Sequence, residues 1–116
     1  GLRPSLTGVH AYCAAKHAVV GLTRSLAMEL AKTAITVNAL CPGYTDTPML
    51  RESLRRIQAK TGCSAEEAEA QLLASNPQGR FIQAEEVAEH ALWLCRDGAA
   101  SITGQSIAIA GGELMP

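Results

Sequence analysis

A long helical segment followed directly by a short strand is the feature that most limits the folds open to this chain. Apolar residues recur every three or four positions across residues 11–32, which predicts an amphipathic helix. The β-branched, apolar run at residues 34–41 follows at once and stops at Pro42-Gly43, as a buried strand does. A helix that leads into a buried strand predicts an α/β fold. The expected apolar stripe of the helix is Ala15, Val19, Leu22, Leu26 and Leu30.

Tyr12 and Lys16 lie near the start of this predicted helix, four positions apart. Residues i and i+4 share one face of a helix, so the phenol and the ammonium can converge on one point. A free phenol is a poor base at neutral pH, and a neighbouring positive charge favours the phenolate. The pair is therefore a candidate for proton exchange with the oxygen of an alcohol or ketone. The alternative is a half-buried tyrosine beside a solvated lysine.

The segment from Pro42 to Thr47 is the second candidate site. Open α/β sheets bind their ligands beyond the carboxyl ends of the strands, and this segment follows such an end. The alternative is an ordinary Pro-Gly turn with no ligand.

Residues 48–80 are predicted to be mostly helical and more polar. Ser64 and Glu67 have the spacing of a capping box, which predicts a second helix over residues 65–74. The apolar stripe of the first helix is Met49, Leu50, Leu54 and Ile57. Its positive charges indicate a solvated face or, alternatively, contact with an anionic tail of a substrate. These charges are Arg51, Arg55, Arg56 and Lys60.

A loop at residues 76–79, a helix at residues 84–95 and a strand at residues 106–110 complete the predicted elements. Gly98 is expected to end the helix, Trp93 to anchor its packing, and Gly111-Gly112 to stop the strand. The residues expected to face inward are Val87, Ala88, Ala91, Leu92 and Leu94. His17 and His90 have no second ligand at a useful spacing, so no metal site is predicted.

Charge and composition exclude several classes of partner. The 116 residues carry a formal charge of -1 without long runs of one sign, so neither a nucleic acid nor a membrane surface is implied. No apolar stretch approaches the ~20 residues of a membrane span, and no signal peptide is present. The four cysteines are far apart and form no C-x-x-C pair, which is typical of reduced packing residues in a cytoplasmic protein.

The stretch AYCAAKHAVVGLTRSLAMELAKTAITVNALCPGYTDTPM at residues 11–49 closely resembles the short-chain dehydrogenase/reductase family. It matches the catalytic helix, the next strand and the following loop, and the Gly-Gln-x-Ile-x-x-x-Gly-Gly ending matches the last strand. The resemblance implies the C-terminal part of a doubly wound, Rossmann-like parallel sheet. Residues 1–116 would then be one fragment of a single domain, with residues 48–80 as the lid over the substrate.

The resemblance also implies roles for individual residues. The tyrosine that matches Tyr12 passes a proton to or from the substrate oxygen. The lysine that matches Lys16 favours the phenolate and hydrogen-bonds the nicotinamide ribose. The loop wraps the nicotinamide end of the cofactor, through the backbone at Thr45 and through the hydroxyl of Thr47. The implied cofactor-binding residues are Tyr12, Lys16, Pro42, Gly43, Thr45 and Thr47.

Several family features are missing from these residues. The glycine-rich turn that carries the cofactor pyrophosphate on a helix N-terminus is absent. The family's serine lies about a dozen residues before the tyrosine, so Ser5 and Thr7 are too close to match it, and the relay asparagine is absent as well. Ala84 stands where proline is usual, and Ala110 where aspartate is common.

The resemblance therefore implies an oxidoreductase that interconverts a secondary alcohol and a ketone with NAD or NADP. The ending and the lid resemble those of 3-oxoacyl reductases and of 3-hydroxyacyl or hydroxybutyrate dehydrogenases. The fragment alone is expected to be inactive, and a homo-oligomer, a dimer or a tetramer, is expected for the full-length protein. The alternative is a non-catalytic fragment that uses its small-residue helix to join an oligomer.

Overall fold

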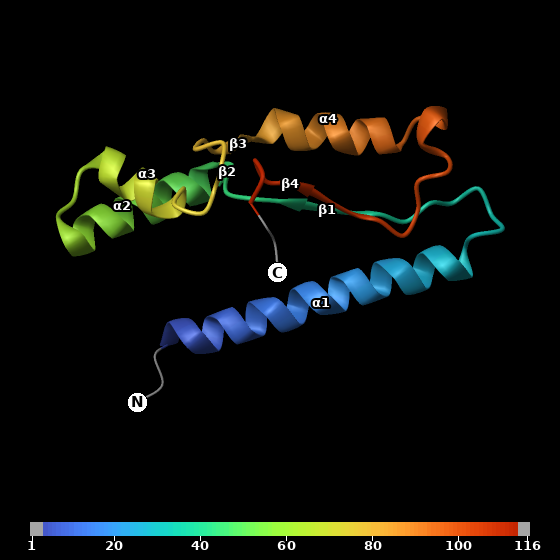
Figure 1. The fold of residues 1–116 in the computed structure, drawn as a ribbon, viewed down its shortest axis with the longest axis horizontal. Helices are drawn as coiled ribbons and strands as arrows, with labels where there is room; N and C mark the ends of the chain where they lie inside the picture. Colours follow the sequence, from blue (N-terminus) through green and yellow to red (C-terminus); the bar gives the residue numbers. More distant parts are fainter. Residues whose placement is uncertain (1–3, 114–116) are drawn as a thin grey trace. The chain divides into compact units, whose positions relative to one another are not determined.

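The computed structural model describes the backbone of residues 4–113 and the side chains of residues 11–113 (Figure 1). Helices and short strands are interspersed along the chain. The elements are α1 (Pro4–Glu29), β1 (Ala39–Pro42), β2 (Thr45–Asp46), α2 (Pro48–Thr61), α3 (Ala65–Leu72), β3 (Ile82–Gln83), α4 (Ala84–Leu94), the 3-10 helix η1 (Asp97–Ala99) and β4 (Ser106–Ile109). Among these residues, no helix is long and apolar enough to cross a membrane.

The strands form two separate pairs, β1 with β4 and β2 with β3. β2 and β3 run parallel, with Thr45 opposite Ile82. In the other pair, the Ala39 amide donates to the Gln105 carbonyl and the Gly43 amide donates to the Ile109 carbonyl, each at 2.9 Å. Both strands advance by four residues in the same direction between these two bonds, which is the parallel arrangement. The described chain divides into two compact units, residues 4–39 with 94–107 and residues 40–93 with 108–113.

Helix α1 begins at Pro4, before the start predicted for the helix at residue 11. Proline suits the first helical turn because its missing N–H needs no partner there. The predicted stripe is also wrong, since Val19 and Leu22 are 52% and 60% exposed. Of the α1 side chains that the structure describes, from residue 11 onward, the buried ones are instead Thr23 and Ala27.

Small residues explain which face of α1 is covered. A Cβ built on Gly104 would lie 3.3 Å from the Ala27 Cβ, which is tighter than most such contacts, so a larger residue would push this turn away from the helix. Gly104 also has a φ of 73°, in the left-handed region that favours glycine. The buried face of α1 is therefore the one where small residues let the turn at Gly104 come close to the helix, and not the one with the largest apolar side chains.

The predicted strand at residues 34–41 is confirmed only in its second half, as β1. Before it, the Val37 amide donates to the Thr103 hydroxyl at 3.0 Å, and the Val37 carbonyl accepts from the Gly104 amide at 2.7 Å. The Asn38 side chain bonds Ile102 and Gln105. The partner of residues 37–38 is thus a turn, so no strand ladder forms there.

Helices α2 and α3 lie side by side in Figure 1 and enclose a small core. Leu50, Leu54, Ala68 and Phe81 are buried in it. The predicted stripe is confirmed except at Met49, which is 79% exposed. The capping box is confirmed as well, because the Glu67 amide donates to the Ser64 hydroxyl at 3.1 Å. The helix that it opens ends at Leu72, two residues earlier than predicted.

Helix α4 has the predicted bounds to within one residue, but its predicted inward face is wrong. None of its side chains is buried, and Leu92 and Trp93 are 63% and 45% exposed. Its apolar face is therefore not covered by the described residues. Gly98 does not end the helix either, since α4 stops at Leu94 and Gly98 lies within η1.

The loop at residues 76–79 explains why β4 stops at two glycines. The side chain of Asn76 is buried and accepts a hydrogen bond from the Gly79 amide at 3.0 Å. A Cβ on Gly111 would lie 2.8 Å from the Asn76 Oδ1, a distance at which something must move. Gly111 also has a φ of 63°. Any other residue there would be strained and would displace the loop.

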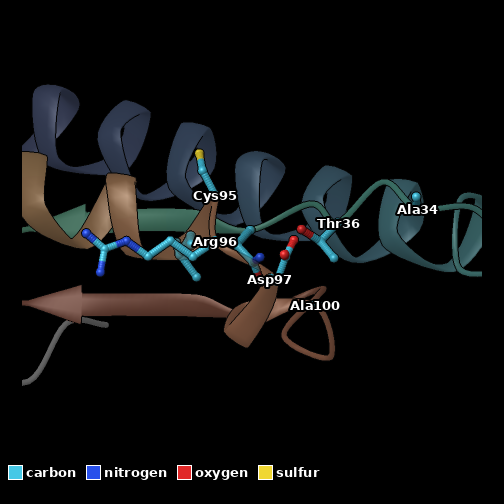
Figure 2. A pocket seen from close by; sticks show the side chains of 8 residues that line it. Ala34, Thr36, Cys95, Arg96, Asp97 and Ala100 are labelled. Carbon is cyan, nitrogen blue, oxygen red and sulfur yellow. The ribbon is translucent and has the colours of Figure 1, made fainter.

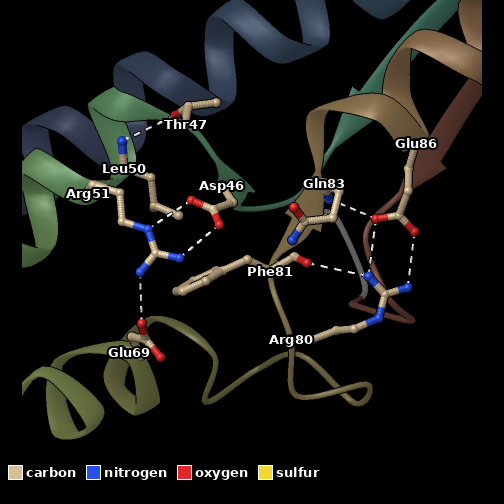
Figure 3. Close-up of polar contacts among 9 residues, drawn as sticks. All are labelled: Asp46, Thr47, Leu50, Arg51, Glu69, Arg80, Phe81, Gln83 and Glu86. Carbon is tan, nitrogen blue, oxygen red and sulfur yellow. Dashed lines mark hydrogen bonds and ion pairs between the residues drawn. The ribbon is translucent and has the colours of Figure 1, made fainter.

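Glu86 opens α4, a role that the sequence patterns did not predict. Its carboxylate accepts the Gln83 amide at 2.7 Å and both Nη groups of Arg80 at 3.0 and 3.1 Å (Figure 3). The reach back from the third helical residue to the N-cap amide is half of a capping box. The Arg80 hydrogen bonds, and then the Gln83 amide, lower the pKa of Glu86 from its ordinary 4.5 to about 2.

This shift predicts how the stability contribution of Glu86 depends on pH. A lowered folded-state pKa means that the contribution is fully present above about pH 4.5 and is lost as the pH falls towards about 2. The urea midpoint difference between the full-length protein and its Glu86→Gln variant should therefore be constant near neutral pH and shrink below about pH 4.5. Glu89→Gln is the control, because Glu89 makes no ion pair within the described residues. A difference that stays unchanged down to about pH 2.5 would contradict the assignment.

Candidate active site

Tyr12 and Lys16 lie one turn apart on α1, as predicted. The Lys16 Nζ is 6.0 Å from the centroid of the Tyr12 ring, so the ammonium and the ring share one side of the helix. Tyr12 is 59% exposed, which leaves its phenol open to a ligand. The structure thus brings the two predicted catalytic residues together.

The Lys16 ammonium has an unusual environment. Its Nζ is shielded from solvent and has no hydrogen-bond partner among the described residues. A buried cation without an acceptor is costly, so the site suits a bound group that brings oxygen acceptors. The ribose hydroxyls of a nicotinamide cofactor are acceptors of this kind, and the residues present fit them.

A second group of predicted residues lines one pocket of about 350 Å³. Gly43, Thr45 and Thr47 contribute to its wall, whereas Pro42 does not line it. Pro42 is the last residue of β1 and is exposed. The remaining lining residues are Tyr44, Met49, Leu50 and Ser53. Three of the four predicted loop residues are therefore brought together, in a largely apolar pocket with several hydroxyl groups.

Backbone geometry fixes the two ends of this loop. A Cβ on Gly43 would lie 3.2 Å from the Ala110 Cα, which is tighter than ordinary contact with a backbone atom. At the other end, Thr47 is the N-cap of α2, and its hydroxyl accepts from the Leu50 amide at 3.2 Å. A threonine hydroxyl that accepts one hydrogen bond still has its own proton to donate. The Thr47 hydroxyl can therefore cap the helix and bind a ligand at the same time.

Behind the loop lies an ion-pair network that sequence reasoning missed (Figure 3). Arg51 donates from Nε to Asp46 Oδ1 and from Nη2 to Asp46 Oδ2, both at 2.8 Å, and from Nη1 to Glu69 Oε1 at 2.9 Å. Its guanidinium lies 5.8 Å from the centroid of the Phe81 ring. The hydrogen bonds from Arg51 lower the pKa of Asp46, and those to Asp46 and Glu69 raise the pKa of Arg51.

Two other arginines of α2 pair locally with Glu52. Arg55 and Arg56 both lie near Glu52, at 3.1 and 3.9 Å, and are 66% and 78% exposed. A solvated helix face accounts for them. Spacing alone could have suggested these local pairs, but not the long-range partner of Arg51, which is 18 residues away in Glu69.

A second pocket of about 350 Å³ lies in the other unit, between the segment before β1 and the turn after α4 (Figure 2). None of the predicted site residues lines it. Asp97 points toward Thr36, whereas the Arg96 guanidinium points away from both (Figure 2). Its charged groups do not converge on one point. The candidate site residues therefore form two groups, the Tyr12–Lys16 pair in one unit and the loop after β1 in the other.

All four cysteines are unpaired. Among the described residues, no group of three or more His, Cys, Asp or Glu side chains could hold a metal ion.

Comparison with known proteins identifies the family. A family model described as enoyl-(acyl carrier protein) reductase matches residues 3–113, nearly the whole chain. A solved short-chain dehydrogenase family protein from Francisella tularensis has a TM-score of 0.82 and 38% identity over 89% of this chain and 43% of its own. The chain belongs to the short-chain dehydrogenase/reductase family. The prediction of an α/β, Rossmann-like fold is confirmed with it.

Two further members of the short-chain dehydrogenase/reductase family are closely similar. A putative ketoacyl reductase of Streptomyces coelicolor is 45% identical over 90% of this chain and 41% of its own length. The actinorhodin polyketide ketoreductase, solved with NADPH as an F189W variant, is 44% identical with a TM-score of 0.76 over 87% of this chain and 39% of its own. The chain thus spans about two fifths of the length of the relatives it matches.

Proposed function

We propose that the full-length protein that carries this chain is an NAD(P)(H)-dependent oxidoreductase that interconverts a secondary alcohol and a ketone. The observation that carries this proposal is the shielded Lys16 ammonium, which has no hydrogen-bond partner among the described side chains, beside the exposed Tyr12 on one face of α1. Membership of the short-chain dehydrogenase/reductase family and similarity to ketoacyl reductases support it.

Tyr12 is the proton donor and acceptor in this proposal. In the direction of reduction, its O–H donates to the carbonyl oxygen as negative charge develops there, and in oxidation the phenolate takes the proton back. Lys16 favours the phenolate through its positive charge and binds ribose hydroxyls. An interaction accelerates the chemical step only if it is stronger in the transition state than in the ground state, and proton donation from Tyr12 to the developing oxyanion is of this kind.

The cofactor is NAD or NADP, and it supplies or accepts the hydride when it is bound. Tyr12, Lys16, Pro42, Gly43, Thr45 and Thr47 are the proposed contacts of its nicotinamide end. The Thr47 hydroxyl has a proton that it can donate to a carboxamide oxygen. The absence of a side chain at Gly43 lets the loop lie close to the backbone of Ala110. The relative solved with NADPH supports this class of cofactor.

A 3-oxoacyl thioester is the proposed substrate class, with a hydroxy acid as the alternative. The pocket beside Thr47 has apolar walls from Tyr44, Met49 and Leu50, which suit an acyl chain. Residues 48–80, which contain α2 and α3, are the proposed lid. The ketoacyl reductases among the relatives support the same class.

The experiment is to assay the full-length protein with NADH and NADPH against 3-oxoacyl thioesters and 3-hydroxy acids, following absorbance of the reduced nicotinamide. Turnover with one of these pairs is expected. Absence of turnover and of cofactor binding, in a protein that is folded, would favour the alternative of a non-catalytic interaction fragment.

That alternative has one observation of its own. Val19 and Leu22 expose a continuous apolar face of α1, with Ala15 also exposed. Such a face suits contact with another surface, so a homo-oligomer is proposed for the full-length protein alongside its activity. The cytoplasm is its proposed location. An enzyme can also be an oligomer, so oligomerisation does not distinguish the two hypotheses. Only the absence of catalytic turnover would favour the non-catalytic fragment.

The 116 residues alone are predicted to lack a competent cofactor site. Two pairs of short strands and the uncovered face of α4 leave apolar surface in water. Burial then falls short of the backbone ordering entropy of roughly 1 to 2 kcal/mol per residue. NADH titration of the isolated chain, followed by fluorescence, should show binding weaker than about 1 mM, with partial order or self-association in sedimentation. A compact monomer with micromolar affinity would contradict this prediction.

A further inference from the structure

Backbone alternation places Asp46 on the opposite side of its strand from the pocket. Thr45 and Asp46 form β2, and Thr47 continues the extended backbone with φ of -135° and ψ of 163°. Successive side chains of an extended chain point to opposite faces. Thr45 and Thr47 line the pocket, and Asp46 does not. The carboxylate of Asp46 instead meets Arg51 (Figure 3).

Arg51 therefore contacts β2 on the side opposite the pocket. Arg51 itself lies in α2, the helix that directly follows this strand. Its side chain binds both oxygens of Asp46, and its amide donates to the Thr47 carbonyl at 3.0 Å. The Leu50 amide holds the Thr47 hydroxyl in the same turn. Two residues of α2 thus fix the backbone and the side chain of Thr47, and Asp46 fixes the backbone between Thr45 and Thr47.

The geometry favours a role in orientation over a role in stability. The side chains of Arg51 and Asp46 are 43% and 29% exposed, and ion pairs exposed to this degree contribute little to stability. A bidentate guanidinium–carboxylate pair, however, fixes both distance and plane. The remaining bond of Arg51, to Glu69, reaches α3 instead of the pocket.

We propose that Arg51 is a positioning residue, which through its bidentate bond to Asp46 orients the Thr45 and Thr47 side chains towards the cofactor. The proposal rests on the proposed function in one respect, that these two threonines contact the nicotinamide end. A displacement of about 1 Å at such contacts can cost on the order of 100-fold in rate. The effect should therefore appear in cofactor affinity and kcat rather than in thermal stability.

The test uses the full-length protein with Arg51→Met, Arg51→Lys, Asp46→Asn and the double variant of Arg51→Met with Asp46→Asn. Arg80→Met is the matched control, since it removes a bidentate arginine–carboxylate pair in the same unit that does not touch the pocket residues. Glu69→Gln removes only the bond to α3. The readouts are NADPH affinity by fluorescence titration, kcat, melting temperature, and hydrogen exchange of the Leu50 amide without cofactor.

The three single variants at Arg51 and Asp46 should each weaken NADPH binding and lower kcat by about tenfold or more. The double variant should be no worse than either single one, because both remove the same interaction. Leu50 exchange should accelerate in these variants only. Arg80→Met and Glu69→Gln should change NADPH affinity and kcat by less than about twofold.

Two results would overturn the proposal. One is equal loss of NADPH affinity in Arg51→Met and Arg80→Met, and the other is an effect of Glu69→Gln as large as that of Asp46→Asn. Should the unaltered protein bind neither NADPH nor NADH, the proposed function is wrong. The Leu50 exchange rates then decide the positioning role alone, where acceleration confined to the Arg51 and Asp46 variants supports it and equal rates refute it.

Discussion

Tyr12→Phe should remove nearly all turnover from the full-length protein while leaving its cofactor affinity almost unchanged. The substitution deletes only the phenol oxygen and retains the ring beside the Lys16 ammonium. General acid–base catalysis typically contributes 10²- to 10⁴-fold, so kcat should fall by about 100-fold or more. The measurement is steady-state kinetics together with a cofactor titration.

The cofactor titration is the internal control for this variant. An unchanged dissociation constant shows that the site is still assembled, so that the loss of rate belongs to the proton transfer. Retention of more than about a tenth of kcat, a loss under ~1.4 kcal/mol, would show that Tyr12 is not the general acid and base.

Lys16→Met should damage both kcat and cofactor binding, because the lysine has two proposed tasks. Methionine has a similar length and no charge, so it cannot favour the phenolate or donate to ribose hydroxyls. We expect the KM for cofactor to rise, kcat to fall by at least about tenfold, and the pH–rate profile to move to higher pH. Kinetics over a pH series at saturating substrate measure all three.

Lys32→Met is the matched control, since Lys32 follows α1 and is exposed. It should leave the pH–rate profile and the KM for cofactor unchanged. A Lys16→Met variant in which only the substrate KM moved, with the pH–rate profile unshifted, would mean that both assigned tasks are wrong.

Local sequence signals predicted most of the elements. Ser64 caps α3 as predicted, and the predicted Leu50 and Leu54 are buried in the core of the proposed lid. Caps and short-range periodicity depend on neighbours within one turn, so the sequence alone is enough for them. The parallel pair of β2 and β3 was missed because two-residue strands carry no periodic signal.

Burial was harder to predict than secondary structure. Val19, Leu22, Leu92 and Trp93 were expected inside and are exposed, whereas Ala27 is buried against Gly104. Periodicity shows that a helix has an apolar face, but whether another element covers that face depends on tertiary contacts. Close approach of small residues leaves no hydrophobic stripe in the sequence.

The site was predicted where a motif has fixed spacing. Tyr12 and Lys16 meet because four residues make one helical turn, and Gly43, Thr45 and Thr47 line one pocket because they are nearly consecutive. The contact between Arg51 and Glu69 joins two helices, and the reach of Glu86 to Arg80 depends on the path of β3. Such contacts arise from the fold, so no spacing in the sequence indicated them.

Transfer of deuterium from C4 of a labelled nicotinamide tests directly whether the full-length protein moves a hydride from the cofactor to a ketone. The full-length protein should be incubated with a 3-oxoacyl thioester and NADH or NADPH that carries deuterium at both C4 positions, and the product analysed by mass spectrometry. We expect one deuterium on the carbinol carbon of the 3-hydroxyacyl product, and almost none from the Tyr12→Phe variant. A hydroxy product without deuterium from either labelled carrier, or equal labelling by the Tyr12→Phe variant, would contradict this expectation.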